Sequence, residues 1–403
     1  MPNTMLKAIA KLTNAELWNA CRKASPTFAS HTAEATKELF TAKGYAELTN
    51  PNAAILNEFF QLSIRVALNV INMSHAKDPL ADAGFGESFD QPFGGITQRM
   101  AIDSIKPVNP AFNLTNGQSV DPFIVRKPKM GERFYDQNFD YQSFITMQNF
   151  NLKQVFISEY GVSELVAGVM EGLQNGWTIQ RYTNKLEVIN AGLNDPTLQD
   201  TQLVGIDYTT GTDEELKNFI LVVKNIITAM SVSAQSSAFN AAGFASTQDK
   251  SRLKLLVRAG LKNNLDVKTL VGAFNPEYLN MGVDIIEVEH FGGIYYQLSA
   301  DQTRLYPVYN SLGEEIGLAK TEEATVAEYT KASPEVEAVD PNANVFAILA
   351  DKGWLFETIQ NEYTVESIHN PRGLYDNMFA SAPNNGIHYD RYYNFVAFVK
   401  NTD

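Results

Sequence analysis

The sequence contains little of what sulfur or metal chemistry requires. Its 403 residues include a single cysteine, Cys21, so no intramolecular disulfide can form and packing alone must hold the fold together. Five histidines are scattered along the chain, and none falls in the spacing of a zinc or calcium motif. We therefore expect no metal ion and no cofactor, and we interpret Cys21 as a small buried apolar residue.

Long apolar runs are also missing. No stretch approaches the roughly 18 uninterrupted apolar residues that a membrane span needs. The N-terminal segment has neither the apolar run nor the cleavage site of a secretory signal. We expect a chain that folds in the cytoplasm and makes no contact with a membrane.

Positive charge is scarce. Against 46 Asp and Glu the chain has 32 Lys and Arg, which gives a net charge of −14. Residues 201–403 carry most of this excess, with 26 acidic and 15 basic side chains. A protein that grips nucleic acid by its phosphates needs a basic footprint. The charge therefore disfavours a general nucleic-acid-binding enzyme and any tight contact with DNA.

Catalytic and nucleotide-binding motifs are absent as well. The sequence contains no phosphate-binding P-loop and no G-x-S-x-G nucleophile turn. The cluster Gly84-Phe85-Gly86 lacks the third glycine, the preceding strand and the following helix of a dinucleotide site. Carboxylates are abundant, but no pattern pairs two of them in a cleft. An enzyme therefore has no specific support.

What is present is an ordinary globular composition, with 44% hydrophobic and 11% aromatic residues. The apolar spacing predicts a mixed α+β fold. The first 75 residues are expected to be mostly helical, with a helix of about 20 residues after Pro51. Residues 76–150 are rich in glycine and proline, and they contain the β-prone pieces 123–125 and 143–147. This composition favours an extended, hairpin-like excursion that completes its burial on a partner.

The clearest helix is predicted at residues 158–194, where apolar side chains recur at helical spacing until Asp195-Pro196. Gly168, Gly172 and Gly176 recur every four residues on this helix. Because glycine weakens a helix interior, we interpret the three as a face that a neighbouring backbone approaches closely.

The second half of the chain alternates helix and strand. Thr212 and Glu215 form a capping box at the start of an apolar helix. Strands are predicted at 253–257, 283–288, 345–349, 354–359 and 392–399, with a short helix at 267–271. The segment 312–341 holds eight acidic residues and is interpreted as a solvated loop or exposed helix, with a cation- or partner-binding tail as the alternative.

The sharpest charged feature is a basic cluster inside the excursion. It consists of Arg126, Lys127, Lys129 and Arg133. One interpretation is a solvated loop tip. The other is a contact with an acidic surface, for which the acidic second half of another copy is available.

Several stretches resemble the Hong Kong 97-type major capsid proteins of tailed phages, in particular the major head proteins of small short-tailed phages of Gram-positive bacteria. They are VDPFIVRKPKMGERFY at 120–135, residues 251–293, NVFAILADKGWLFE at 344–357, IHNP at 368–371 and IHYDRYYNF at 387–395. The resemblance implies an α+β Hong Kong 97-type fold. Its expected parts are an N-terminal arm (1–94, largely helical), an extended β loop (95–150), a peripheral domain (151–200) with a spine helix at about 158–194, an axial domain (201–343) and returning peripheral strands (344–403).

The resemblance further implies a structural protein without catalytic residues. It would assemble with copies of itself, through hexamers and pentamers, into an icosahedral shell that encloses double-stranded DNA without binding it tightly. A scaffold protein, a portal and other virion proteins would be its partners, and the virion its final location. An encapsulin-type bacterial compartment shares the fold and would bind a cargo peptide. A cytoplasmic enzyme is the alternative from a different class.

Overall fold

The computed structural model describes most of the chain but not all of it. The described residues are 13–32, 34, 77–90, 95–103, 127–148, 161–197, 203–206, 212–232, 236–244, 247–261, 282–298, 302–309, 315–320, 336–360, 364–370, 372–373 and 375–401. The helix predicted after Pro51, the strand at 123–125, the helix at 267–271 and Arg126 lie outside these ranges. Most of the acidic segment 312–341 also lies outside them.

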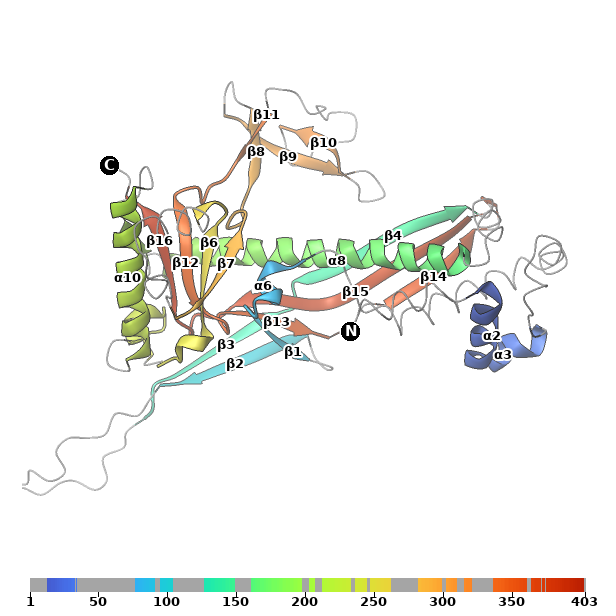
Figure 1. The fold of residues 1–403 in the computed structure, drawn as a ribbon, viewed down its shortest axis with the longest axis horizontal. Helices are drawn as coiled ribbons and strands as arrows, with labels where there is room; N and C mark the ends of the chain where they lie inside the picture. Colours follow the sequence, from blue (N-terminus) through green and yellow to red (C-terminus); the bar gives the residue numbers. More distant parts are fainter. Residues whose placement is uncertain are drawn as a thin grey trace, which may run out of the picture.

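The longest element is helix α8, Gly161–Leu193, which has 33 residues. Its bounds lie within the predicted 158–194, and Figure 1 shows it crossing the molecule beside a long sheet. The helix ends before Asp195, whose carboxylate accepts a hydrogen bond from the Tyr389 hydroxyl at 2.8 Å. Pro196 follows and brings no backbone N–H to continue the ladder. In the part of the chain that the structure describes, no helix is long and apolar enough to cross a membrane.

The long sheet beside α8 has the order β1-β13-β15-β14, and β4 pairs with β15 outside that path. Its strands are β1 (Glu87–Asp90), β4 (Phe139–Gln148), β13 (Leu355–Ile359), β14 (Thr364–Asn370) and β15 (Tyr375–Tyr389). Trp177 of α8 stacks on Phe139 and meets the edge of Tyr141, with ring centroids 5.2 and 5.0 Å apart. Residues 139–148, expected within the extended loop, are therefore part of the body, because alternate aromatic residues of β4 are buried against the helix.

The central sheet has the order β5-β16-β12-β6-β7. Its strands are β5 (Leu203–Ile206), β6 (Leu253–Arg258), β7 (Asp284–Val288), β12 (Val345–Asp351) and β16 (Phe395–Lys400). Every residue of β12 is buried. Ile348 and Ala350 enter the core that contains α8, and Ala347 and Leu349 enter a second core. Helix α10 (Asp213–Ser231), with the predicted capping box of Thr212 and Glu215, packs in that second core.

This sheet crosses an expected boundary. Strands β12 and β16 come from residues 344–403, yet they pair with β6 and β5 from residues 201–343. Strands β13, β14 and β15 from the same C-terminal segment join the long sheet instead. A division at residue 343 therefore does not separate the two sheets, because the segment after it supplies strands to both.

A third sheet stands off the body (Figure 1). It has the order β10-β9-β8-β11, formed by β8 (Tyr295–Leu298), β9 (Arg304–Tyr309), β10 (Glu315–Ala319) and β11 (Val336–Val339). The turn that leads into it crosses α8 at backbone distance. Gly292 has a φ of +77°, and a Cβ there would lie 2.2 Å from the carbonyl oxygen of Leu186. Only glycine is compatible with both the backbone conformation and this contact.

The N-terminal part includes two helices, α2 (Asn14–Ala24) and α3 (Pro26–His31), and the short α6 (Pro79–Asp82). Trp18 and Phe28 bring α2 and α3 together, with ring centroids 4.9 Å apart. Part of the expected arm at 1–94 packs on the body, since Leu80 and Phe85 are buried in its core and β1 pairs with β13. The described residues also include the short helices η2 (Ser236–Phe239) and η3 (Lys250–Arg252).

A buried ionic cluster fixes residues 77–90 to the body. Lys185 of α8 has 2% of its surface exposed, and its Nζ lies 2.6 Å from Asp78 Oδ2 and 2.7 Å from Glu357 Oε1. Arg181, one turn earlier on α8, also pairs with Glu357. The other oxygen of Asp78 accepts from the backbone N–H groups of Leu80 and Ala81, so it caps α6. Burial favours the neutral carboxyl, but the two cations outweigh it and lower the pKa of Glu357.

Candidate assembly interface

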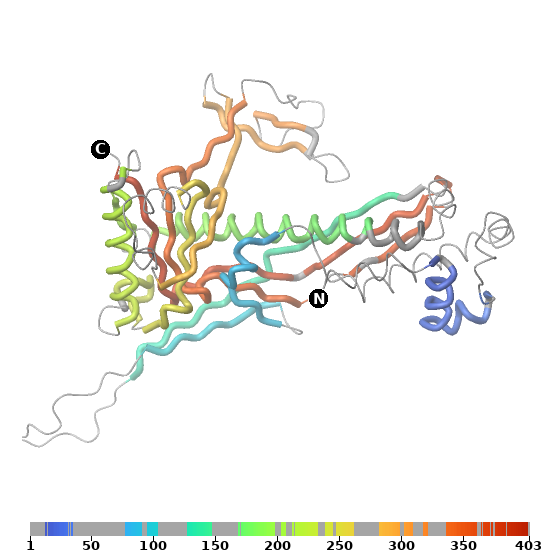
Figure 2. Tube along the Cα trace, viewed as in Figure 1, coloured from blue at the N-terminus to red at the C-terminus, as the bar shows by residue number. Residues whose placement is uncertain are grey.

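A two-stranded ribbon leaves the body below the long sheet. Strands β2 (Ile96–Ile102) and β3 (Met130–Asp136) pair antiparallel, with Ile96 opposite Asp136 and Ile102 opposite Met130. Figure 2 traces the chain along this ribbon and then from β3 into β4, which continues beside α8. The hairpin-like excursion expected from the sequence thus contains a regular ribbon.

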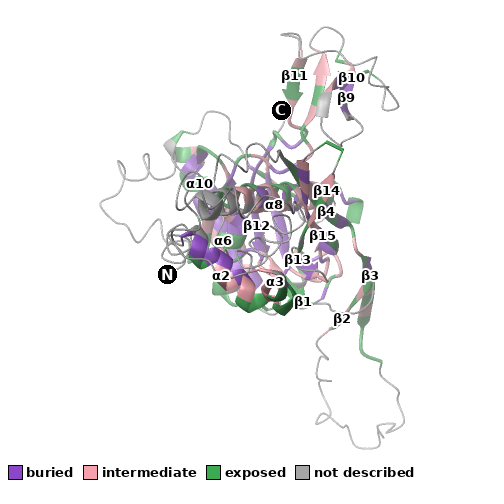
Figure 3. Ribbon diagram, turned by 90° about the vertical axis from the view of Figure 1, so that its right-hand side faces the viewer, coloured by how far each residue is buried: buried purple, intermediate pink, exposed green. Residues whose placement is uncertain are grey.

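The ribbon has two different faces because side chains alternate along a strand. Its outward face carries five apolar side chains that are each more than half exposed. They are Ile96 (57%), Met100 (57%), Ile102 (60%), Met130 (55%) and Phe134 (61%). Figure 3 shows this exposure along β2 and β3, whereas buried residues gather around α8 and β12. An apolar stripe of this kind is typical of a protein–protein contact.

The inward face carries two arginines, Arg99 and Arg133, that lie opposite each other in the register. The guanidinium of Arg99 lies 4.4 Å from the centre of the Phe356 ring, and its Nε is 3.2 Å from Asp390 Oδ2. The guanidinium of Arg133 lies 5.0 Å from the Tyr135 ring and 5.4 Å from the Tyr389 ring. These contacts hold the ribbon against its own subunit.

The start of β3 is anchored in a further way. Lys129 Nζ donates to the carbonyl oxygens of Ala242 and Gly243 at 2.7 and 3.3 Å, and it lies 4.5 Å from the centre of the Phe244 ring. At Gly131 a Cβ would come within 2.5 Å of the Tyr392 ring. Glycine at this position therefore lets β3 lie directly on the aromatic ring.

Burial dominates the titration of the groups beneath the ribbon. Desolvation raises the pKa of Asp390, although the backbone N–H of Tyr392 and the two arginines favour its charged form. Desolvation also raises the pKa of Tyr135 above its usual value, so its hydroxyl stays neutral. Burial lowers the pKa of His388 to about 4, so its imidazole is neutral near pH 7. The ribbon therefore sits on one buried carboxyl group and several uncharged polar groups.

Of the predicted basic cluster, Lys129 and Arg133 lie on the part of the ribbon that contacts the body. Arg126 is outside the described residues, and Lys127 is exposed. Lys129 and Arg133 contact groups of their own chain, because β3 lies on the body there. The expected contact of the cluster with an acidic surface of another copy stays a prediction. The ion pair of Arg99 with Asp390 also lies beneath the ribbon. The sequence analysis did not predict this pair, and only the alternation within residues 96–102 pointed to Arg99.

The three spaced glycines of α8 differ from one another. A Cβ at Gly168 or at Gly172 would meet no atom within 4 Å, whereas at Gly176 it would lie 3.0 Å from the Tyr141 hydroxyl oxygen. Close approach within the described part of this chain therefore occurs at Gly176 alone among the three. The backbone at Gly192, a position outside the four-residue spacing, is packed more closely against its neighbour. A Cβ there would lie 2.6 Å from the Trp354 ring.

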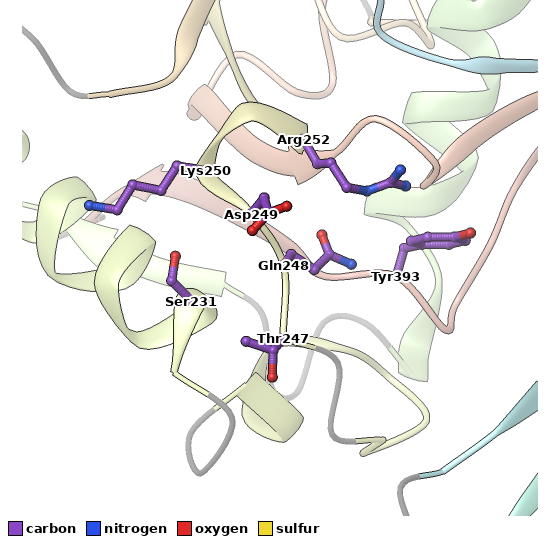
Figure 4. A pocket seen from close by; sticks show the side chains of 7 residues that line it. All are labelled: Ser231, Thr247, Gln248, Asp249, Lys250, Arg252 and Tyr393. Atoms are coloured by element: carbon purple, nitrogen blue, oxygen red, sulfur yellow. The ribbon is translucent and has the colours of Figure 1, made fainter.

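A polar cavity of about 550 Å³ lies between the end of α10 and η3 (Figure 4). It is lined by Ser231, Thr247, Gln248, Asp249, Lys250, Arg252 and Tyr393. The guanidinium of Arg252 is held by Asp351 and Glu87, each at 3.0 Å, so its charge is already balanced. Within the described ranges, no group of three or more His, Cys, Asp or Glu side chains could hold a metal ion.

Comparison with known proteins agrees with this fold. The family model for Phi29-like phage major capsid proteins matches residues 18–399. The major capsid protein of Bacillus phage B103 is 21% identical over 362 residues, which are 87% of this chain and 65% of that protein. The chain thus spans about two thirds of the length of that relative.

Two solved structures have a similar fold. A chain of the capsid structure of Staphylococcus phage Andhra aligns with a TM-score of 0.57 and 15% identity, covering 82% of this chain and 86% of that one. A chain from the structure of head fiber and inner core protein gp22 of native bacteriophage P68 aligns with a TM-score of 0.53 and 14% identity, covering 78% and 85%. The expected α+β, Hong Kong 97-type capsid fold is confirmed.

Proposed function

The chain belongs to the Phi29-like phage major capsid protein family, and we propose that it assembles by laying the outward face of the β2–β3 ribbon on a second copy. The observation that carries this proposal is the apolar stripe of Ile96, Met100, Ile102, Met130 and Phe134. The inward face is held by Arg99, Lys129 and Arg133, so the stripe is presented by a fixed support.

The stripe is large enough to stabilise a repeated contact. Each of its side chains has more than half of its surface in water. Burying the exposed part stabilises by roughly 1 kcal/mol per side chain, or about 5 kcal/mol for the stripe before the entropy of association is subtracted. A shell repeats this contact in every copy, so a modest single contact supports cooperative assembly.

The contact is heterologous, since the ribbon of one copy lies on a different surface of the next. Such contacts generate rings when the rotation between copies closes, and open filaments when it does not. We extend the proposal to hexamers and pentamers that build an icosahedral shell around double-stranded DNA. The net charge of −14 fits a container whose wall repels packed phosphates. A scaffold, a portal and other virion proteins are further proposed partners, and assembly takes place in the host cytoplasm.

In this proposal the chain has a structural role and no catalytic step. The peripheral domain consists of α8 and the long sheet, and the axial domain consists of α10 and the central sheet. This assignment places β12 and β16 in the axial domain, which revises the expected boundary at residue 343.

The test is the double variant Met100→Ser/Phe134→Ser, expressed with the neighbouring head genes of its phage. We expect it to fold with the parent's thermal stability and to lose particle formation, measured by sedimentation and negative-stain microscopy. Leu221→Ser is the matched control, because Leu221 on α10 is 59% exposed and belongs to neither strand of the ribbon. Particles of the double variant at the parent's yield would contradict the proposal.

A further inference from the structure

The ribbon meets the body at one buried acid, Asp390. Asp390 is 2% exposed and follows β15, at the point where the chain turns toward β16. Arg99 from β2 contacts its Oδ2 at 3.2 Å, and the charge of Arg133 from β3 also acts on this carboxyl group. Its Oδ1 accepts from the backbone N–H of Tyr392 at 3.0 Å. One side chain thus connects β2 to a fixed turn of the body and also feels the charge of Arg133 on β3.

A contribution to the stability of the folded subunit does not explain this arrangement. Burial of the Asp390 carboxylate outweighs the attraction of both arginines, because the pKa of Asp390 is raised. The arginines have other support. Arg99 lies 5.2 Å from the Phe89 ring and 5.4 Å from the Tyr393 ring in addition to Phe356. Replacing a buried ion pair by neutral groups is often neutral or stabilising, whereas such pairs can fix one geometry.

The rest of the inward face consists largely of ring contacts. A guanidinium over an aromatic ring is attracted to the whole face, so it restrains distance more than direction. A hydrogen-bonded carboxylate is directional, and the turn at Tyr392 fixes its position in the body. The other titratable groups that interact electrostatically with Asp390 are Tyr135 from β3 and Tyr392 and Tyr393 from the turn. Asp390 is the acid that the turn itself holds in place.

We propose that Asp390 is a positioning residue, which sets the direction in which the ribbon leaves its subunit so that the apolar stripe meets the second copy in one orientation. The inference rests on the proposed function, because the direction of the ribbon affects assembly only if the apolar stripe binds a second copy. In physical terms, the carboxylate holds the ribbon in its docking-competent state at the expense of subunit stability.

The test is Asp390→Asn, which removes the charge and retains an oxygen for the Tyr392 N–H. Asp351→Asn is a closely matched control, since Asp351 is 0% exposed, has a raised pKa, pairs with Arg252 and accepts from the Gly353 N–H at 2.7 Å. Ribbon direction is read from the distance between spin labels at Lys127→Cys and Asn225→Cys, at subunit concentrations too low for assembly. Both positions are exposed, and Cys21 is fully buried.

We expect Asp390→Asn to unfold at the parent's denaturant concentration or above it, to broaden the label distance distribution and to reduce particle yield. If one ribbon in ten points in the docking direction, the apparent affinity of the contact falls about tenfold. Asp351→Asn is expected to keep the parent's narrow distribution. Two results would overturn the inference: a narrow distribution with the parent's yield, or a loss of yield that only follows a loss of stability. In either case a defect of Met100→Ser/Phe134→Ser would leave the proposed function standing.

Discussion

Lys185→Met tests the buried ionic cluster that joins residues 77–90 to the body. The substitution removes a cation whose side chain is 2% exposed, and it leaves two buried carboxylates, Asp78 and Glu357, at 7% and 6% exposure. Arg181 still pairs with Glu357, but Asp78 keeps only the backbone donors of α6. An uncompensated buried charge of this kind destabilises a protein by about 3–5 kcal/mol. We expect a loss of that size in the free energy of unfolding.

The matched control is Lys254→Met. Lys254 is buried to a similar extent, with 9% of its side chain exposed, but its partner Asp284 is 72% exposed. Water solvates Asp284 once the lysine is gone, so we expect the control to lose only about 0–1 kcal/mol. Urea unfolding of both variants, followed by circular dichroism on unassembled subunits, measures the difference. If Lys185→Met and Lys254→Met lost the same free energy, the cluster would not hold residues 77–90 in the way described.

The cluster also has a pH signature. The pKa of Glu357 is lowered in the folded chain, so the unfolded chain takes up a proton near the ordinary value of 4.5 while the folded chain does not. The stability that Glu357 contributes is therefore present above pH 4.5 and is lost as the pH falls through the lowered pKa. In Lys185→Met the folded pKa of Glu357 lies higher, because the cation that lowers it most is gone, so acidification below pH 4.5 costs less stability than in the parent.

Two further predictions concern single residues. Gly192→Ala places a methyl group 2.6 Å from the Trp354 ring and is expected to lower the free energy of unfolding by about 1–3 kcal/mol. Gly172→Ala, with no atom within 4 Å of the added methyl group, is expected to keep or raise that free energy. Equal melting temperatures of the two variants would refute this contrast. His388→Gln removes a group that the unfolded chain protonates near pH 6.5 and the folded chain only near pH 4. The free energy of unfolding of the parent therefore falls more steeply than that of His388→Gln as the pH decreases from 6.5 to 4, and parallel pH profiles would show that His388 is not buried in this way.

Local sequence patterns predicted where helices and strands lie better than they predicted which sheet each strand joins. The capping box of Thr212 and Glu215 needs only residues three apart, and it is confirmed. Strands β12 and β13 both follow from apolar runs, and three residues separate them. They nevertheless join different sheets, because Gly353 and the buried Trp354 turn the chain between them. No local feature of either run indicates which sheet it enters.

The same limit applies to the ribbon. Its basic residues could be found from charge alone, since Lys129 and Arg133 are conspicuous in a segment rich in glycine and proline. Their ring and carbonyl partners lie far along the chain, at Tyr389 and Ala242, so the sequence could not show that they point inward. The apolar stripe follows from the register of the two strands, because residues 96, 100, 102, 130 and 134 then all fall on the same face of the ribbon.

The most direct test of the account is a cryo-electron microscopy reconstruction of particles assembled from this chain, at a resolution that shows side chains. The account predicts that the outward face of the β2–β3 ribbon lies on a second copy, with Met100 and Phe134 in van der Waals contact with it. A shell in which both side chains face solvent in every subunit would contradict the account.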